Sequence, residues 1–210
     1  MGFFDRNRRE LVARGIAADR LPPGQYATER FPVLHIGDVP SYADLSRWDL
    51  RVFGLVNQAR TLSWAQLSDL PSAFIEVDIH CVTKWSKFDT GWRGVPVEAV
   101  LELVDVHPAA THLMGHGEYG YTANVALEDV VGTDGRGQPR ALLAYEHAGR
   151  PLDPEHGYPL RLLVPRLYLW KSAKWLRGLE LLPLDTPGFW ERNGYHMYGD
   201  PFREQRYADD

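Results

Sequence analysis

Apolar and polar residues alternate with a period of two at several places along the chain, which predicts short β-strands. In residues 47–56, Trp48, Leu50 and Val52 alternate with charged residues, as in a half-buried strand. Residues 74–81 repeat the alternation, and their apolar face consists of Ile75, Val77, Ile79 and Cys81. Further strands are expected at 111–115, 121–126, 141–147 and 160–169.

Helical signals are fewer. Ser63 and Gln66 have the spacing of a capping box and predict the start of a helix. Pro96 opens a second helix over 97–104, with apolar residues at helical spacing. Before Leu-Pro-Pro-Gly at 21–24, the Arg-rich beginning of the chain predicts a short helix followed by an extended arm. Because strands outnumber helices, we expect a mixed, strand-rich α+β fold.

The chain is expected to form one domain. Its 210 residues, 44% hydrophobic, can bury a sizeable core, and no repeat or Gly/Ser linker divides them. We expect an N-terminal arm over 1–27, the body of the domain over 28–183 and a C-terminal tail over 184–210. The tail is too aromatic to be disordered, so it should pack on the body; its rings include Trp190, Tyr195, Tyr198 and Tyr207.

Charge and composition exclude several classes of protein. A formal net charge of −5 has the wrong sign for a protein that coats nucleic acid. No apolar run is long enough to span a membrane. One cysteine cannot form an internal disulfide, and no signal-peptide-like stretch follows Arg8-Arg9, so we expect a cytoplasmic protein.

Short local motifs give little indication of a catalytic, metal-binding or phosphate-binding site. The eight histidines form no His-x-His pair, and neither a nucleophile elbow nor a phosphate-binding glycine loop is present. His80 and Cys81 are neighbours on a strand, so their side chains point to opposite faces. Taken alone, Cys81 is best interpreted as an inert buried cysteine.

The stretch from His156 to Leu179 is strongly basic. It contains no carboxylate and five cations, namely Arg161, Arg166, Lys171, Lys174 and Arg177. A solvated basic face is one interpretation. Apolar neighbours favour partial burial instead, and buried cations need anions, so a bound phosphate is the alternative.

Three ordered segments carry a family resemblance. Residues 80–86, His-Cys-Val-Thr-Lys-Trp-Ser, followed by Trp-Arg-Gly-Val at 92–95, resemble the cysteine segment of the sulfite-oxidase-type molybdopterin proteins, which include bacterial sulfoxide reductase catalytic subunits. Residues 156–165 and 171–176 resemble that family's pterin-phosphate-binding stretches. The resemblance covers residues 28–183 and implies the family's mixed, strand-rich fold with a molybdenum-molybdopterin cofactor.

The resemblance also implies roles for individual residues. Cys81 would be the protein ligand of molybdenum, which suits a soft thiolate. Cofactor contacts would come from His35, His116, His156, Arg161, Ser172, Ala173 and Lys174, the last three at the phosphate. Tyr195 lies where sulfite oxidases carry an active-site tyrosine, although ordinary packing of the tail explains it equally well.

The chain departs from the sulfite oxidases at their substrate-binding arginines, since it has Leu34 in one such segment and Lys84 to Lys87 in the other. The resemblance therefore implies oxygen-atom transfer on a small oxo compound, a sulfoxide, a sulfite-like anion or another, without assigning it. Electrons would pass to or from a separate partner. Two alternatives stay open: a scaffold that keeps the fold without turnover, and a simple anion-binding module.

Overall fold

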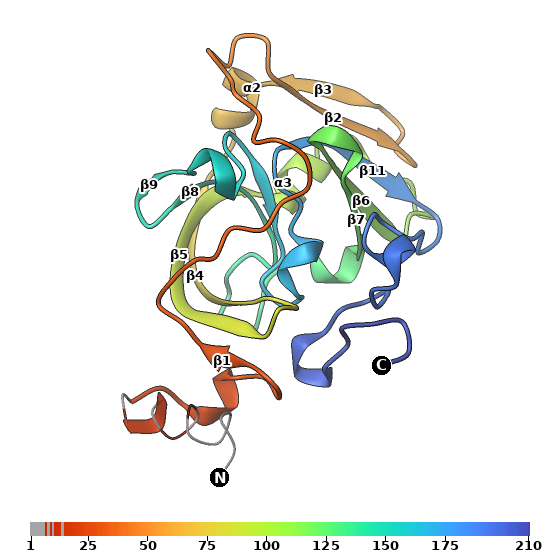
Figure 1. The fold of residues 1–210 in the computed structure, drawn as a ribbon. Coiled ribbons are helices and arrows are strands. Elements are labelled where there is room, and N and C mark those ends of the chain that lie inside the picture. The colour runs from red at the N-terminus through yellow and green to blue at the C-terminus, as the bar shows by residue number, and fades with distance from the viewer. Residues whose placement is uncertain (1–6, 8, 10, 14) are drawn as a thin grey trace.

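In the computed structural model, which describes residues 7, 9, 11–13 and 15–210, eleven strands form two mixed sheets and helices are few and short. This confirms the predicted strand-rich α+β class. The sheets lie beside each other, and the C-terminal segment runs along their lower side (Figure 1). The helix predicted near the N-terminus falls partly outside the described residues.

The first sheet has six strands. They are β1 (Tyr26–Ala27), β4 (Ala73–His80), β5 (Trp85–Pro96), β8 (Leu142–His147), β9 (Arg150–Pro151) and β10 (Arg161–Leu163). β4 and β5 form an antiparallel hairpin, β5 also pairs with β8, and β8 pairs with β10. The short β1 adds to β5 in parallel.

The second sheet has five strands. They are β2 (Asp49–Gly54), β3 (Arg60–Ser63), β6 (His112–Gly117), β7 (Thr122–Ala126) and β11 (Leu176–Leu182). β11 lies between β2, to which it is parallel, and β6, to which it is antiparallel. The basic stretch therefore begins in one sheet, at β10, and ends in the other.

The two helices predicted after residue 60 are present. α2 (Trp64–Ser68) begins at the capping box, because the Ser63 side chain accepts from the Gln66 N–H while the Gln66 side chain accepts from the Ser63 N–H. α3 (Val97–Leu101) is shorter than predicted, and residues 102–104 continue as turns that still bury Val104. Single 3-10 turns occupy Ala18–Arg20, Glu118–Gly120, Leu127–Asp129, Pro154–His156, Leu169–Lys171, Glu191–Asn193 and Pro201–Arg203. Among the described residues no helix is long and apolar enough to cross a bilayer.

The apolar core has two parts. The larger part joins the sheets, with Leu50 of β2 and Leu143 of β8 among its members. The smaller part covers the other face of the first sheet and contains Ile75, Ile79 and Cys81. The predicted apolar face of residues 74–81 is therefore buried, and it leads the chain to Cys81 at the end of the strand.

One predicted strand is wrong in its length. Residues 160–169 form a strand only over Arg161–Leu163, and 3-10 structure begins at Leu169. Pro165 has no N–H to donate to a neighbouring strand, which explains the early end. The remainder of this segment bends into loops that line a cavity.

Candidate active site

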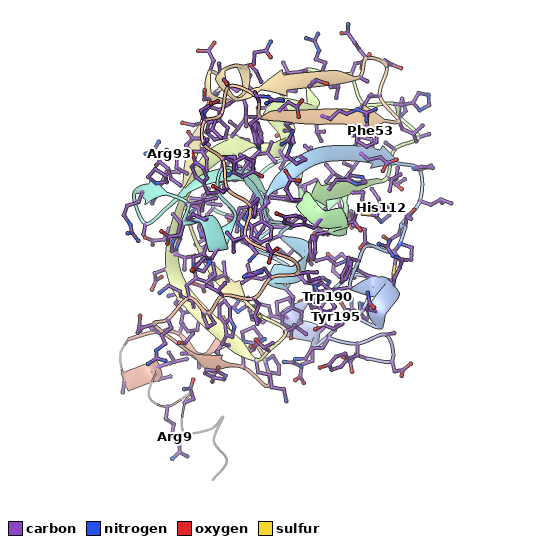
Figure 2. All side chains as sticks on the ribbon, turned by 45° about the horizontal axis from the view of Figure 1, so that its top comes forward. Arg9, Phe53, Arg93, His112, Trp190 and Tyr195 are labelled. Atoms are coloured by element: carbon purple, nitrogen blue, oxygen red, sulfur yellow. The ribbon has the colours of Figure 1, made fainter. Side chains whose placement is uncertain are left out.

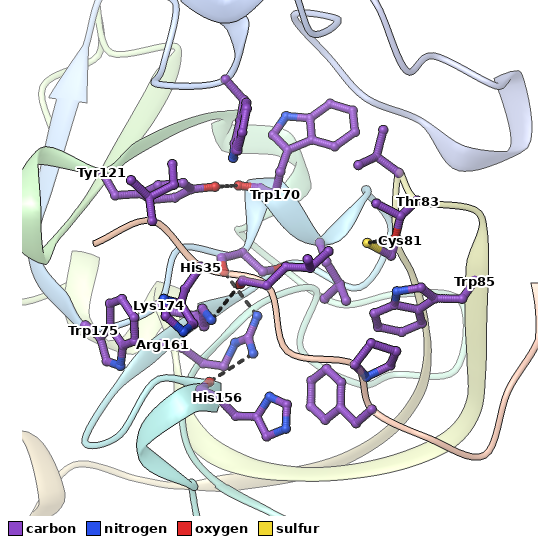
Figure 3. Close-up of a pocket in the computed structure, with 18 of the residues that line it drawn as sticks. His35, Cys81, Thr83, Trp85, Tyr121, His156, Arg161, Trp170, Lys174 and Trp175 are labelled. Atoms are coloured by element: carbon purple, nitrogen blue, oxygen red, sulfur yellow. Dashed lines mark hydrogen bonds between the residues drawn. The ribbon is translucent and has the colours of Figure 1, made fainter. Parts of the chain in front are cut away.

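A cavity of about 340 Å³ opens where the β4–β5 turn, the loops around β10 and the C-terminal segment meet (Figure 3). It is lined from five parts of the chain, at 31–36, 81–85, 121, 156–175 and 190–195. Its walls are mostly apolar and aromatic, with a few polar groups, as is usual for small-molecule sites.

Cys81 is held at the start of a tight turn between β4 and β5. Its N–H donates to the Trp85 carbonyl at 2.9 Å, and its carbonyl accepts from the Lys84 N–H at 3.0 Å. Lys84 has a φ of 72°, in the left-handed region that closes the turn. Main-chain bonds on both sides thus fix the position from which the sulfur reaches the cavity.

The thiol of Cys81 is nearly enclosed. The residue is 6% exposed, and its Sγ lies 3.1 Å from the Thr83 hydroxyl. Burial raises the pKa of this thiol, against the opposing effect of the Thr83 hydrogen bond. The group is therefore a neutral thiol, and a thiophilic metal would have to displace its proton.

Arg161 is a buried cation with an unused donor. Its Nη1 donates to the His156 carbonyl at 3.0 Å and its Nη2 to the Ser172 carbonyl at 3.1 Å, while its buried Nε has no partner. Burial lowers the pKa of Arg161 to about 10, so the guanidinium is still charged at neutral pH. A buried charge bonded only to neutral carbonyls leaves this end of the cavity suited to an anion.

Lys174 lies beside it. Its Nζ donates to the carbonyls of Leu34 and Glu155 at 2.8 and 2.7 Å. Burial and the neighbouring Arg161 charge lower its pKa to about 7. The same two causes, together with Lys174, lower the pKa of His156 to about 4, so this imidazole, stacked on Phe31, is neutral.

The remaining cations of the basic stretch have carboxylate partners. Lys171 pairs with Glu191 at 2.6 Å, Arg166 with Asp129 at 3.4 Å, and Arg177 with Asp49 at 2.5 Å. Among the described residues, Arg161 and Lys174 form no ion pair. The anion site suggested by the sequence is therefore confined to these two cations.

The structure brings most of the predicted site residues together. Those that line the cavity are His35, Cys81, His156, Arg161, Ser172, Lys174 and Tyr195. The Ala173 side chain points into the larger core instead, and its carbonyl accepts from the Leu162 N–H at 2.8 Å. His35 reaches the cavity from the segment between β1 and β2, where its ring contacts Trp175.

His116 is not brought into the cavity. Its Nε2 lies 2.9 Å from a Glu180 carboxylate oxygen, and its ring packs beside Phe53. These partners belong to β11 and β2, so His116 is held on the second sheet. Among the described residues, the structure therefore gives it no contact with the group of Cys81, Arg161 and Lys174.

Sequence reasoning missed the aromatic lining. Tyr121, Trp170, Trp175 and Trp190 all face the cavity, and the Tyr121 hydroxyl donates to the Trp170 carbonyl at 2.5 Å. These residues are scattered over 70 positions, and no local spacing marks them. Val82, Thr83 and Trp85 also line the cavity, and these were within reach of a sequence argument because they belong to the cysteine segment at 80–86.

Chemically, the cavity combines one soft sulfur donor with an anion site and aromatic faces. Among the described residues, no group of three or more His, Cys, Asp or Glu side chains could hold a metal ion. A metal bound to Cys81 alone would take its other ligands from a cofactor. The cations would then neutralise an acidic group of that cofactor, and the rings would pack on its flat parts.

A family model and a bacterial relative both match most of this chain. The family model described as oxidoreductase molybdopterin binding domain matches residues 36–190. A Bacillus subtilis (strain 168) protein named uncharacterized oxidoreductase YuiH is 48% identical over 191 residues, which cover 91% of this chain and 93% of that protein.

More distant relatives have names that state an activity. The protein-methionine-sulfoxide reductase catalytic subunit MsrP of Gluconobacter oxydans (strain 621H) is 30% identical, covering 72% of this chain and 52% of the relative. Sulfite oxidase of Arabidopsis thaliana is 26% identical, covering 77% of this chain and 49% of the relative. The chain thus spans nearly all of the Bacillus protein and about half of the other two.

A solved structure shares the fold. The crystal structure of the sulfane dehydrogenase SoxCD from Paracoccus pantotrophus superposes with a TM-score of 0.61 at 21% identity, covering 73% of this chain and 42% of that chain. This agrees with the sulfite-oxidase-like architecture expected from the sequence.

Proposed function

This chain belongs to the oxidoreductase molybdopterin binding domain family, and from that premise we propose that it is a molybdenum-pterin enzyme in which Cys81 is the protein ligand of the metal. The observation that carries the proposal is the position of Cys81. Its thiol opens into the same cavity as Arg161 and Lys174, the two cations of the basic stretch that form no ion pair among the described residues.

The cavity residues fit such a cofactor. Arg161 has a buried Nε donor without a partner, and Lys174 is held only by main-chain carbonyls, so both have capacity for a phosphate group. The Ser172 carbonyl and hydroxyl are already used by Arg161 and by the Val164 N–H, so Ser172 fixes the geometry of this end. Trp175 and His35 provide ring faces next to the cations.

When bound, the cofactor would supply a two-electron oxidation–reduction centre able to give or take an oxygen atom. The chain's own residues do the rest. Cys81 would lose its proton and hold the metal, and the Thr83 hydroxyl hydrogen-bonds its sulfur. Burial raises the pKa of Tyr195, so its hydroxyl stays protonated and can donate to a substrate oxygen.

The proposed reaction is oxygen-atom transfer on a small oxo compound. In the reducing direction, R₂SO takes up two protons and two electrons and gives R₂S and water; oxidation runs the same balance in reverse. We propose that a separate electron-transfer protein provides or accepts the electrons. The surrounding rings would exclude bulk water from the reacting atoms.

Metal analysis tests the proposal directly. The protein is purified from a host that makes molybdopterin, and molybdenum is measured in the wild type and in Cys81→Ser. We expect nearly stoichiometric metal in the wild type and a large loss in the variant, with unchanged circular dichroism. Reduction of a sulfoxide by a reduced viologen dye then tests turnover. Metal-free wild-type protein, purified beside a loaded control enzyme, would contradict the proposal.

A further inference from the structure

The part of the cavity next to Cys81 differs in character from the end that holds the cations. Among the described residues that line the cavity, Arg161 and Lys174 are the only lysine or arginine side chains, and no Asp or Glu is present. Both cations lie on the side of His156 and Trp175 (Figure 3). Trp170, in contrast, lies on the side of Thr83 and Cys81 (Figure 3), and Tyr195 lines the same cavity.

Three rings form one face here, which we call the aromatic wall: Trp170, Trp190 and Tyr195. Tyr195 stacks on Trp190 with ring centroids 4.7 Å apart, and the edge of Trp170 meets Tyr195 at 5.0 Å. Figure 2 shows Trp190 and Tyr195 side by side on the C-terminal segment. All three line the cavity, so the wall offers a broad apolar surface with one hydroxyl.

A buried ion pair fixes this wall. One Glu191 carboxylate oxygen accepts from the Trp170 indole N–H at 2.7 Å and lies 2.6 Å from the Lys171 ammonium. Lys171 also donates to the Met197 carbonyl at 2.5 Å, so it holds the chain on both sides of Tyr195. Since Lys171 and Glu191 neutralise each other, they orient the rings without adding net charge to the wall.

The wall is therefore rigid, apolar and uncharged. An anion placed against it would lose hydration without gaining a counter-charge, whereas an apolar group would be released from water onto aromatic faces. A preorganised surface loses little conformational entropy on binding. These properties favour a substrate that carries no charge and has an apolar substituent.

We propose that the aromatic wall binds the apolar substituent of an uncharged S-oxide or N-oxide, so that the site selects such compounds over anions such as sulfite. The inference rests on the proposed function and narrows its substrate class. Trp190 and Trp170 act as specificity-determining residues, and Lys171 and Glu191 act as positioning residues behind them.

Two substrates test the selectivity, methyl phenyl sulfoxide and sulfite. Reduction of the sulfoxide is followed with a reduced dye as electron donor, and oxidation of sulfite with an oxidised dye as electron acceptor. Molybdenum-loaded wild type should have a kcat/KM at least about tenfold higher for the sulfoxide. Trp190→Ala should raise the KM for the sulfoxide about tenfold with kcat nearly unchanged, because an aromatic contact is lost from binding. Trp64 is another half-buried tryptophan, and it does not line the cavity. Trp64→Ala is therefore the matched control and should leave the KM unchanged.

Calorimetry of the cofactor-free protein gives a readout independent of turnover. Trp190→Ala should weaken the binding of methyl phenyl sulfoxide about tenfold. It should leave the affinity for sulfate, which probes the cationic end of the cavity, unchanged. If Trp190→Ala does not fold, Trp190→Leu takes its place with a smaller expected effect.

A preference for sulfite, or equal weakening of both ligands by Trp190→Ala, would overturn the inference. Failure of the proposed function looks different: the wild type would then lack molybdenum while the calorimetric difference between the two ligands persists.

Discussion

Lys171 and Glu191 form a fully buried ion pair, with Nζ and Oε1 2.6 Å apart and both side chains without solvent exposure. The pair joins the loop after β10 to the C-terminal segment. Burial lowers the pKa of Lys171, and the Glu191 charge opposes that effect. The side-chain oxygen Oδ1 of Asn124 also accepts from the ammonium at 2.8 Å. A charge held in this way is stable only while its carboxylate partner is present.

Glu191→Gln should therefore destabilise the protein strongly. The amide can still accept from the Trp170 indole, but the Lys171 ammonium is left in the interior without a counter-charge. We expect the free energy of unfolding to fall by about 3–5 kcal/mol, measured by urea denaturation.

The double variant Lys171→Met with Glu191→Leu is the control. It removes both charges at once and should recover much of the lost stability, because no uncompensated charge remains. A double variant no more stable than Glu191→Gln would show that the pair does not act through charge compensation.

The sequence predicted those elements whose signal is local. The alternation in residues 74–81 and the Ser63–Gln66 capping box each depend on a few adjacent residues, and the structure confirms both. β5 was not predicted, because its 12 residues include charged side chains and two glycines, and its pairing partners, β4 and β8, are set by the tertiary fold. The same holds for β11, which lies between two strands distant in sequence.

The candidate site was predictable to a similar extent. The cysteine segment and the basic stretch could be found by their residues, but the pairing of Lys171 with Glu191 and of Arg177 with Asp49 could not. Such pairs join residues 20 to 128 positions apart, so only the fold shows which cations are left for a ligand. His116 illustrates the same point, since Glu180 holds it on the other sheet.

Gly94→Ala should lower stability because the chain leaves no space for a side chain there. A Cβ at Gly94 would lie 2.3 Å from the Leu143 carbonyl oxygen, at an irregular point in the pairing of β5 with β8. Overpacking of this kind costs roughly 1–3 kcal/mol, to be measured by urea denaturation. Gly135→Ala, where a Cβ meets nothing within 4 Å, should change stability little; equal effects of the two substitutions would contradict the argument.

His80 should make stability depend on pH. It is 3% exposed, its Nδ1 lies 2.8 Å from the Ser86 hydroxyl, and burial lowers its pKa to about 4. In the unfolded chain the His80 imidazole binds a proton as the pH falls through about 6.5, whereas in the folded chain it stays neutral until about pH 4. The contribution of His80 to the free energy of unfolding is therefore fully present above pH 6.5 and is lost as the pH falls toward 4.

The contribution of His80 to this slope is at most roughly 1.4 kcal/mol per pH unit. His80→Gln should remove it, as seen by urea denaturation at pH 4.5 and 7.5. The exposed His107 provides the control: His107→Gln should keep the wild-type slope, and a slope unaltered by His80→Gln would contradict the assignment. His147 and His156, whose pKa values burial also lowers to about 4, should supply the slope that remains.

Lys174 should make anion binding by the cofactor-free protein depend on pH. Its pKa is lowered to about 7, so the ammonium is charged at pH 6 and largely neutral at pH 8. The facing Arg161 stays charged and His156 stays neutral over this range, since their pKa values lie near 10 and 4. Sulfate, which does not titrate here, should therefore bind about tenfold more weakly at pH 8 than at pH 6 in calorimetry.

Two variants assign this dependence. Lys174→Met should bind sulfate weakly and equally at both pH values, because only the Arg161 charge remains at this end. His35→Gln changes the exposed imidazole on the same side of the cavity, and it should keep the wild-type dependence if Lys174 is the titrating group. Loss of the pH dependence in His35→Gln, or its persistence in Lys174→Met, would assign the titration to another group and remove Lys174 from the anion site.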